Sequence, residues 1–166
     1  MTNFSIEPLT PEHLRWHELL ACVETEGQRR WLEFALEHHL SSHVLAAFKE
    51  GVVAGFLRFV VQPIGPADYC PPLMLDGEIL TEAKILAFGV SGQFRRQGIG
   101  ILLQIAAIDH ARARGCYQVR SWSTLDHIAN HHLKLRLGFS AHPEQRDNGQ
   151  QGYYYLLPLR GIMAQH

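Results

Sequence analysis

The sequence predicts a single mixed α/β domain, and three observations lead to this prediction. The chain has 166 residues, of which 46% are hydrophobic, which is enough for one globular domain with its own core and leaves no room for a second. Strand-like and helix-like segments alternate from one end to the other. No internal repeat, low-complexity tract or linker interrupts them. We therefore expect one domain that covers residues 1–166.

The first sixty residues predict one strand, two helices and a β-hairpin. Thr10 and Pro11 suit the cap and the first position of a helix. In the second helix, Trp31 and Phe34 belong to the inward face. The Glu50-Gly51 pair lies between two β-rich runs, as the two-residue turn of a hairpin does. The predicted elements are a strand at 4–7, helices at 11–23 and 28–40, and strands at 43–49 and 52–61.

The second part of the chain begins with a long loop. Residues 62–80 contain four prolines and two glycines, which excludes a central strand through most of the segment. Loops of this length in compact domains commonly contribute to function. Beyond the loop we predict strands at 81–90, 117–124 and 153–159 and helices at 98–114 and 125–137.

A phosphate-binding site is predicted where the strand at 81–90 passes into the next helix. The chain there reads Arg95-Arg96-Gln97-Gly98-Ile99-Gly100. Glycines let a backbone approach a ligand closely, and the first-turn N–H groups of a helix have no partner within it. The helix dipole and two arginines add positive charge suited to phosphate oxygens. The segment differs from a nucleotide P-loop because neither Lys-Ser nor Lys-Thr follows Gly100, and the dinucleotide fingerprint Gly-x-Gly-x-x-Gly is absent.

At this point the sequence resembles the GNAT superfamily of acetyl-CoA-dependent N-acetyltransferases. The family's signature is Arg or Gln, two residues, Gly, one residue, then Gly or Ala, after the fourth strand; Arg95, Gly98 and Gly100 meet it. The segment 133–139 ends in Leu-Gly-Phe, which resembles the common end of the family's fourth helix. The predicted order of elements also matches over nearly the whole chain. The resemblance implies the GNAT fold, an α/β (α+β) fold with a central mixed, mostly antiparallel sheet of six to seven strands flanked by about four helices.

The resemblance further implies the activity and the cofactor site. The implied activity moves the acetyl group of acetyl-CoA to a primary amine of an unidentified small molecule or peptide, by direct attack in a ternary complex. The backbone from Arg95 to Ile101 would hold the CoA pyrophosphate, and the strand edge at Phe88 to Val90 would pair with the pantetheine arm. His127 stands where an Asn often begins the fourth helix. The expected CoA-binding residues are Phe88, Gly89, Val90, Arg95, Arg96, Gln97, Gly98, Ile99, Gly100, Ile101 and His127.

Glu82 is the candidate for the catalytic base. An acceptor amine must be neutral to attack, and for a lysine-like amine with a pKa of about 10.4 this requires about 4.6 kcal/mol at pH 7. On an unbroken strand Glu82 shares one face with Lys84 and Phe88. By the resemblance, the catalytic Glu of histone-acetylating relatives falls at Lys84 and that of other members at Leu86. A bulge in this strand would change the faces, and a solvated carboxylate at the strand end is the other interpretation of Glu82.

Lys134 is the candidate for the group that protonates the departing CoA thiolate. Many relatives place a Tyr at this position of the fourth helix for that purpose. A lysine could donate the proton or pair with CoA; alternatively, Lys134 lies on the solvated face of the helix. Water or one of Tyr153, Tyr154 and Tyr155 are further options.

Composition and charge exclude several classes. The net charge of -1 gives no overall basic field, so we expect no nucleic-acid partner. No apolar run approaches the ~20 residues that span a bilayer, and no signal peptide is recognised, so we expect a cytoplasmic protein without a membrane partner. Three cysteines without paired spacing fit reduced thiols. Of eleven histidines, His127 and His131 lie four residues apart, but no Cys pair or third ligand accompanies them and we expect no metal.

The acceptor and two alternative functions stay open. The replaced Tyr and Glu leave a GNAT-fold acyl-CoA-binding regulatory module with little or no transferase activity as the main alternative, and a protein that binds another phosphate ligand as a further one. The loop at 62–80 is expected to form an acceptor-side wall, where Asp68, Asp76 and Glu78 could attract a cationic amine. Polyamine, aminoglycoside, amino acid and protein N-terminus all stay candidates. Edge strands permit a homodimer.

Overall fold

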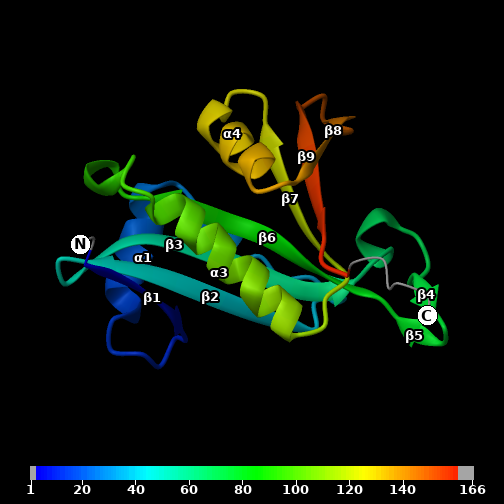
Figure 1. Cartoon of the computed structure of the whole chain (residues 1–166), viewed down its shortest axis with the longest axis horizontal. Coiled ribbons are helices and arrows are strands. Elements are labelled where there is room, and N and C mark those ends of the chain that lie inside the picture. Colours follow the sequence, from blue (N-terminus) through cyan, green and yellow to red (C-terminus); the bar gives the residue numbers. More distant parts are fainter. Residues whose placement is uncertain (1–2, 161–166) are drawn as a thin grey trace, which may run out of the picture.

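A seven-stranded sheet forms the centre of the computed structural model, which describes residues 3–160 (Figure 1). In spatial order its strands are β1 (Phe4–Leu9), β2 (Ser41–Lys49), β3 (Val52–Pro63), β6 (Thr81–Val90), β7 (Gln118–Thr124), β9 (Gln151–Pro158) and β8 (Ser140–Gln145). All neighbouring strands are antiparallel except β6 and β7, which are parallel. This arrangement confirms the predicted mixed, mostly antiparallel sheet.

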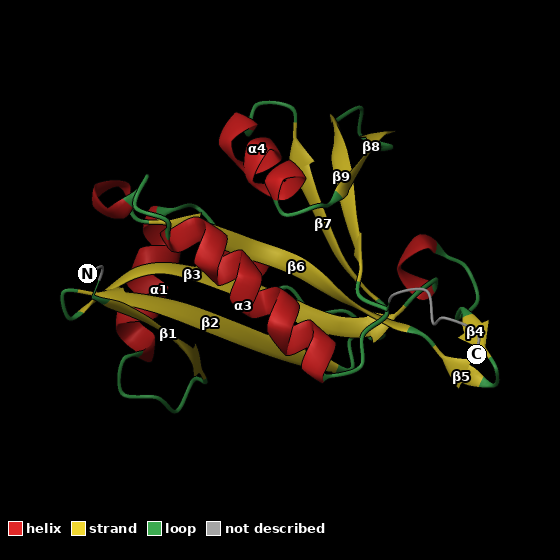
Figure 2. Ribbon diagram, viewed as in Figure 1, coloured by secondary structure: helices red, strands yellow, loops and turns green. Residues whose placement is uncertain are grey.

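Four α-helices flank the sheet in the described part of the chain (Figure 2). They are α1 (Trp16–Thr25), α2 (Arg29–Glu33), α3 (Ile99–Ala113) and α4 (Ile128–Arg136). One core cluster joins α3 to the face of β3 that carries Leu57 and Phe59, and a second joins α1 and α2 to the opposite face, which carries Phe56. The alternation of apolar side chains along β3 therefore buries both faces of the strand.

The two N-terminal helices are shorter than predicted. Residues 10–16 form turns, in which the N–H of His13 bonds the carbonyl of Thr10 and the N–H of Trp16 bonds the carbonyl of His13. Helix α1 begins only at Trp16, so the prediction that Thr10 caps a helix starting at Pro11 is wrong. The predicted helix at 28–40 ends at Glu33, and Phe34 has an extended backbone with φ −58° and ψ 127°. The buried Arg58 of β3 explains this ending, because its guanidinium donates 2.7 Å hydrogen bonds to the carbonyls of Trp31 and Phe34. Those carbonyls consequently have partners without a longer helix.

The six predicted strands are correct, and three others, β8 and the short strands β4 and β5, were not predicted. The hairpin turn at Glu50 and Gly51 is confirmed, with φ of 52° and 77°, as a two-residue primed turn requires. Sequence analysis missed β8, since this outer edge strand is polar and contains Pro143, which suits only a sheet edge. Within the loop at 62–80, β4 (Met74–Leu75) and β5 (Glu78–Ile79) form a small separate ladder. Met74, Leu75 and Ile79 of this ladder are exposed apolar residues, as is Leu73 just before it.

The sheet opens between β6 and β7. These strands pair only where Glu82, Ala83 and Lys84 lie beside residues 118–120, and beyond Lys84 they diverge in a V (Figure 1). One edge of β6 from residue 85 to 90 is thus left without a neighbouring strand. Helix α4 is fixed to the far side of the V, since Asn130 donates to Ser123 of β7 and His131 bonds Tyr155 of β9. No helix between residues 3 and 160 is both long and apolar enough to cross a membrane.

Candidate functional site

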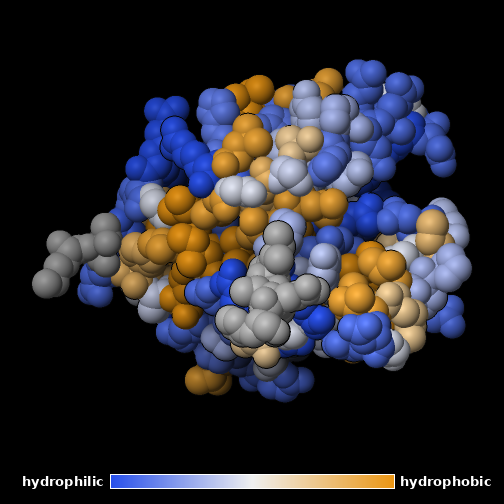
Figure 3. Space-filling view, turned by 45° about the vertical axis from the view of Figure 1, so that its right-hand side comes forward, coloured by the Kyte–Doolittle hydropathy of each residue, from blue (hydrophilic) through white to orange (hydrophobic). Residues whose placement is uncertain are grey.

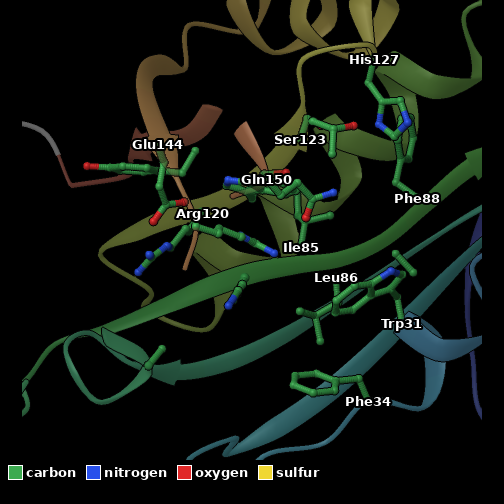
Figure 4. Close-up of a pocket in the computed structure, with 18 of the residues that line it drawn as sticks. Trp31, Phe34, Ile85, Leu86, Phe88, Arg120, Ser123, His127, Glu144 and Gln150 are labelled. Carbon is green, nitrogen blue, oxygen red and sulfur yellow. The ribbon is translucent and has the colours of Figure 1, made fainter. Parts of the chain in front are cut away.

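A cleft of about 830 Å³ occupies the opening between β6 and β7. Its walls come from β6, β7, α4, the segment at 28–36 and the segment at 144–150. Figure 4 shows that Phe88 and His127 lie at one end, while Arg120 and Glu144 lie at the other. Figure 3 shows a notch between the β8–β9 lobe and the loop that carries β4 and β5, with hydrophilic residues at its base. The cleft therefore connects two chemically different ends.

The loop before α3 exposes the first turn of that helix. Arg96 and Gly98 both have left-handed backbones, with φ of 59° and 84°, and Gly98 is the N-cap of α3. The first intrahelical bond is the 3.3 Å bond from the N–H of Leu102 to the carbonyl of Gly98. The N–H groups of Ile99, Gly100 and Ile101 consequently point out of the helix, as the first N–H groups of any helix do. They form a site for an anion at the positive end of the helix dipole.

The two glycines of this loop are needed for different reasons. Gly98 requires its positive φ, which side chains other than glycine adopt at a free-energy cost. Gly100 has ordinary backbone angles, but a Cβ there would lie 3.2 Å from Cζ of Phe88. The spacing Gly-x-Gly thus combines a turn with a close approach of α3 to β6. The side chain of Ile99 between them is buried in the core.

The arginines of the loop have separate roles. Arg95 donates to the carbonyl of Val90 at 2.9 Å and to a carboxylate oxygen of Glu26 at 2.7 Å, so its guanidinium holds the loop to β6 and α1. Arg96 is exposed and forms no hydrogen bond or ion pair with any residue between 3 and 160. Gln97 accepts a bond from Lys49 and donates to the carbonyl of Gln93. The prediction that both arginines are available to phosphate therefore fits Arg96 better than Arg95.

Strand β6 changes faces at a bulge. Arg58 pairs with Ala87 and Phe59 with Ile85, so Leu86 has no partner residue on β3. Before the bulge Glu82 faces the same side as Gln62; after it Phe88 faces α3. Glu82 and Phe88 therefore lie on opposite faces of β6, whereas an unbroken strand would place them on the same face.

Glu82 lies behind the cleft rather than on its wall. It is only 1% exposed, it is absent from the cleft lining, and neither carboxylate oxygen has a hydrogen-bond partner among the described residues. The nearest cation is Arg120, whose guanidinium is 3.9 Å away. Burial raises the pKa of Glu82, while the charges of Arg120 and Lys84 oppose the rise. The solvated strand-end carboxylate considered from the sequence is excluded by this burial.

Lys134 reaches the cleft from α4. It is 1% exposed, and its Nζ donates a 2.7 Å hydrogen bond to Oε1 of Gln104 on α3. The ring of Phe139 lies 4.8 Å from the same nitrogen. Burial lowers the pKa of Lys134 to about 7, and no charged neighbour contributes to this shift. The interpretation of Lys134 as a solvated surface lysine is thus wrong.

The histidines and tyrosines near α4 divide between the cleft and the core. His127 is the N-cap of α4 and lines the cleft, as does Tyr154. His131 is buried, with one ring nitrogen bonded to the hydroxyl of Tyr155 and the other at 3.0 Å from the carbonyl of Thr124. These bonds give His131 a structural role. From residue 3 to residue 160, no group of three or more His, Cys, Asp or Glu side chains is arranged to hold a metal ion.

Two of the three acidic residues of the 62–80 loop are already paired with arginines. Asp68 lines the cleft and accepts two hydrogen bonds from Arg120, of 2.5 and 3.0 Å. Glu78 pairs with Arg160 at 3.1 Å, and Asp76 lies in the turn between β4 and β5. The loop does contribute a wall of the cleft, through 67–69. It does not offer the three free carboxylates that the sequence suggested.

Several residues of the site were not singled out from the sequence. Gln104 and Asn130 line the cleft, as do Arg120 and Arg146. Arg120 belongs to the side of β7 that also carries Gln118 and Trp122, the more exposed side of an alternating strand. That alternation could have selected Arg120, but no signal in the sequence shows that this side faces a cleft.

Comparisons with known proteins agree with the geometry. The model of the Acetyltransferase (GNAT) family matches residues 10–139. The fold is similar to that of Arabidopsis thaliana NAA60 in complex with acetyl-CoA (TM-score 0.72, 16% identity, 96% of this chain and 100% of that chain). It is also similar to a putative acyl-CoA N-acyltransferase from Klebsiella pneumoniae (0.66, 19%, 96% and 100%) and to the ribosomal-protein-S18-alanine N-acetyltransferase from Escherichia coli (0.64, 18%, 97% and 97%). No curated protein matches significantly.

Proposed function

Since the chain belongs to the GNAT acetyltransferase family, we propose that it is an N-acetyltransferase that moves the acetyl group of acetyl-CoA to a primary amine by direct attack in a ternary complex. The observation that carries the proposal is the exposed first turn of α3, which packs at Gly100 against Phe88 at one end of the cleft, next to the unpaired edge of β6. A similar fold in Arabidopsis NAA60 holds acetyl-CoA. This similarity supports acetyl-CoA as the acyl donor.

The CoA pyrophosphate would bind at the start of α3. The N–H groups of Ile99, Gly100 and Ile101 donate to its oxygens, and Arg96 supplies the nearby guanidinium. The pantetheine arm would follow the open edge of β6 at Phe88 to Val90, where an extended amide chain can pair as a strand does. His127 would contact CoA from the opposite wall. In this position the thioester lies deeper in the cleft than the pyrophosphate.

Lys134 would protonate the leaving group. The amine nitrogen forms a bond to the thioester carbon, the C–S bond breaks, and CoA departs as a thiolate that needs a proton. An ammonium whose pKa is about 7 gives its proton readily to a thiolate whose conjugate acid has a pKa near ~8.5. Gln104 fixes the position of Nζ through the 2.7 Å hydrogen bond. The buried lysine thus has the protonation chemistry of the tyrosine that it replaces.

Glu82 would take the proton that the amine releases, through water rather than by direct contact. Its two carboxylate oxygens and both amide atoms of its cross-strand neighbour Gln62 are buried without partners. Buried polar groups of this kind are normally satisfied by ordered water. A raised pKa suits a base that works near neutral pH. Water molecules at Glu82 would connect it to the cleft past Arg120.

Two measurements test the proposed function together. Calorimetry should detect binding of CoA, and steady-state thiol release from acetyl-CoA should increase when a suitable amine from an acceptor set is added. Absence of CoA binding would refute the proposal. Binding of CoA without acceleration by any amine would support the regulatory module instead, a protein that binds acyl-CoA with little transfer.

A further inference from the structure

The end of the cleft farthest from the start of α3 is lined by three cations from three elements. Lys84 comes from β6, Arg120 from β7, and Arg146 from the segment between β8 and β9. Arg120 and Arg146 both lower the pKa of Lys84, and Arg120 also lowers the pKa of Arg146, so the three cations lie close enough to interact. If the proposed function holds, the acceptor amine enters at this end, because CoA occupies the other.

Two of these cations have no counter-ion. The third cation, Arg120, forms a bidentate ion pair with Asp68, and its guanidinium also lies 3.9 Å from the carboxylate of Glu82. Neither Lys84 nor Arg146 forms an ion pair with any carboxylate in the part of the chain that the structure describes. Burial first, and then Arg120, lower the pKa of Lys84. Burial also lowers the pKa of Arg146, against the opposing effect of Glu144. An anionic group of a ligand would stabilise the charged forms of Lys84 and Arg146 and so oppose the lowering of both pKa values.

The position of Arg146 is fixed by stacking. Its guanidinium carbon lies 3.5 Å from the ring centre of Trp122, and both residues line the cleft. A stacked guanidinium keeps its N–H edge available, which suits a planar carboxylate. Lys84 is placed by the short parallel pairing of β6 and β7, where it lies beside Arg120. Both cations are thus held by rigid strands or rings.

An apolar wall faces this charge. Trp31, Phe34 and Leu36 line the cleft, and Figure 4 shows Trp31 and Phe34 on the other side of β6 from Arg120 and Glu144. Arg58 holds this wall through its bonds to two of its carbonyls. Because this wall and the two unpaired cations line one cleft, a ligand that extends past the open edge of β6 can contact both.

We propose that the acceptor is a small primary amine that also carries a carboxylate and an apolar group, as an apolar α-amino acid does. Arg146 and Lys84 bind the carboxylate, and Trp31 and Phe34 contact the apolar group. The cations disfavour the ammonium form of the acceptor amine, which helps its deprotonation. They also repel polycationic acceptors such as polyamines and aminoglycosides.

Matched acceptors test this assignment by thiol release from acetyl-CoA. The kcat/KM for L-phenylalanine should exceed that for L-phenylalaninamide at least about tenfold, although the amide, in which an uncharged group replaces the carboxylate, has the less basic amine. Phenethylamine and spermidine should be poorer still. If phenylalaninamide, phenethylamine or spermidine equals or exceeds phenylalanine, the assignment is overturned, while transfer to that amine leaves the proposed function intact. A peptide that begins with Phe-Asp distinguishes a side-chain carboxylate from that of a free amino acid.

Variants locate the carboxylate subsite. Arg146→Gln combined with Lys84→Met should reduce the phenylalanine to phenylalaninamide ratio to about one, through an increase in the KM for phenylalanine. Arg112→Gln is the control for Arg146→Gln, since it removes one guanidinium from the exposed end of α3, and it should keep the ratio. A ratio that survives the double variant refutes the assignment.

Product binding gives a readout that needs no turnover. Calorimetry should detect N-acetyl-L-phenylalanine binding to the CoA complex, and the double variant or the uncharged N-acetyl-L-phenylalaninamide should weaken binding at least about tenfold. If CoA binds but no acceptor is acetylated, transfer fails and this titration alone decides the inference. Equal binding of acid and amide, or no binding of either, overturns it.

Discussion

The two ends of the cleft differ in the part of the chain that faces the ligand. At the start of α3 the ligand meets backbone N–H groups in a loop shaped by Gly98 and Gly100. At the proposed acceptor end it would meet the side chains of Lys84 on β6, Arg120 on β7 and Arg146 in the segment between β8 and β9. A site made of backbone N–H groups can bind a diphosphate whatever side chains surround it. The specificity of a site made of side chains, in contrast, can change with a single substitution. If the proposed function holds, we expect the donor end to be general to the fold and the acceptor end to be specific to this protein.

The largest effect is expected at the donor end. Gly98→Val with Gly100→Leu forces strain at a positive φ and inserts atoms against Phe88, and CoA affinity should fall about 1,000-fold. Calorimetric titration of CoA measures the loss. Gly77→Ala is the matched control, because it has a similar φ of 81° with nothing near its Cβ in the β4–β5 turn. The control should bind CoA with unchanged affinity. A double variant that keeps most of its CoA affinity would contradict a CoA site built from the backbone of this loop.

Between the two ends, Lys134→Met should lower kcat by about 100-fold, because it removes the proposed acid from the leaving group. CoA affinity should change little. With the wild-type residue, kcat should fall as the pH rises above about 7, where the ammonium is lost. This descending limb should be missing in Lys134→Met, and Lys134→Tyr should restore part of the rate at neutral pH. An unchanged pH profile of kcat in the Met variant would contradict a role in proton transfer.

The same lysine should make folding stability pH-dependent. Its pKa is about 7 in the folded protein and about 10.4 in an unfolded chain. Between these values the unfolded chain binds the extra proton, so the free energy of unfolding should increase as the pH rises from about 7 to about 10. Up to roughly 5 kcal/mol follows from this shift. Denaturant unfolding of Lys134→Met should show a more stable protein at pH 6.5, with an advantage that shrinks by pH 10.

At the acceptor end, Arg58→Met should loosen the apolar wall without changing the donor end. The loss of its bonds to the carbonyls of Trp31 and Phe34 should lower the free energy of unfolding by about 2 to 4 kcal/mol. The KM for the acceptor should rise about tenfold, since the wall no longer has a fixed position. Denaturant unfolding and steady-state kinetics check both numbers. An equal loss of CoA affinity would show that the two ends are not independent.

The smallest effect separates the two arginines of the loop. Arg96→Gln should weaken CoA binding about threefold, and the difference should disappear at high salt because the side chain is exposed. Arg95→Gln should instead release the loop from Val90 and Glu26 and lower stability. Calorimetry at two salt concentrations makes the distinction. A salt-sensitive CoA effect at Arg95 with none at Arg96 would reverse these roles.

The contrast between the ends also explains what could be predicted from sequence. Gly98 and Gly100 act through local backbone geometry, so their spacing was enough to locate the loop and the start of α3 within one residue. The end of α2 depends on Arg58, which is 24 residues from Phe34. Similarly, the hydrogen-bond partner of the buried Lys134 is Gln104, 30 residues away. A local sequence pattern around α2 or α4 includes neither Arg58 nor Gln104, so it could not predict these contacts.

Two further errors have structural causes of the same kind. One inserted residue at Leu86 moves Phe88 to the face opposite Glu82, and only the pairing with β3 shows that bulge. Asp68 and Glu78 were expected to be free carboxylates because their ion-pair partners, Arg120 and Arg160, lie far away in the sequence. Charges and faces at the acceptor end are therefore products of tertiary structure.

A crystal structure of the protein with CoA would test the division of the cleft most directly. The pyrophosphate oxygens should lie within hydrogen-bond distance, about 3 Å, of the backbone N–H groups of Ile99 to Ile101, with the thiol sulfur toward Nζ of Lys134 and residues 84 and 146 left uncovered. A pyrophosphate bound instead by Lys84 and Arg146, with the start of α3 exposed to solvent, would contradict the account.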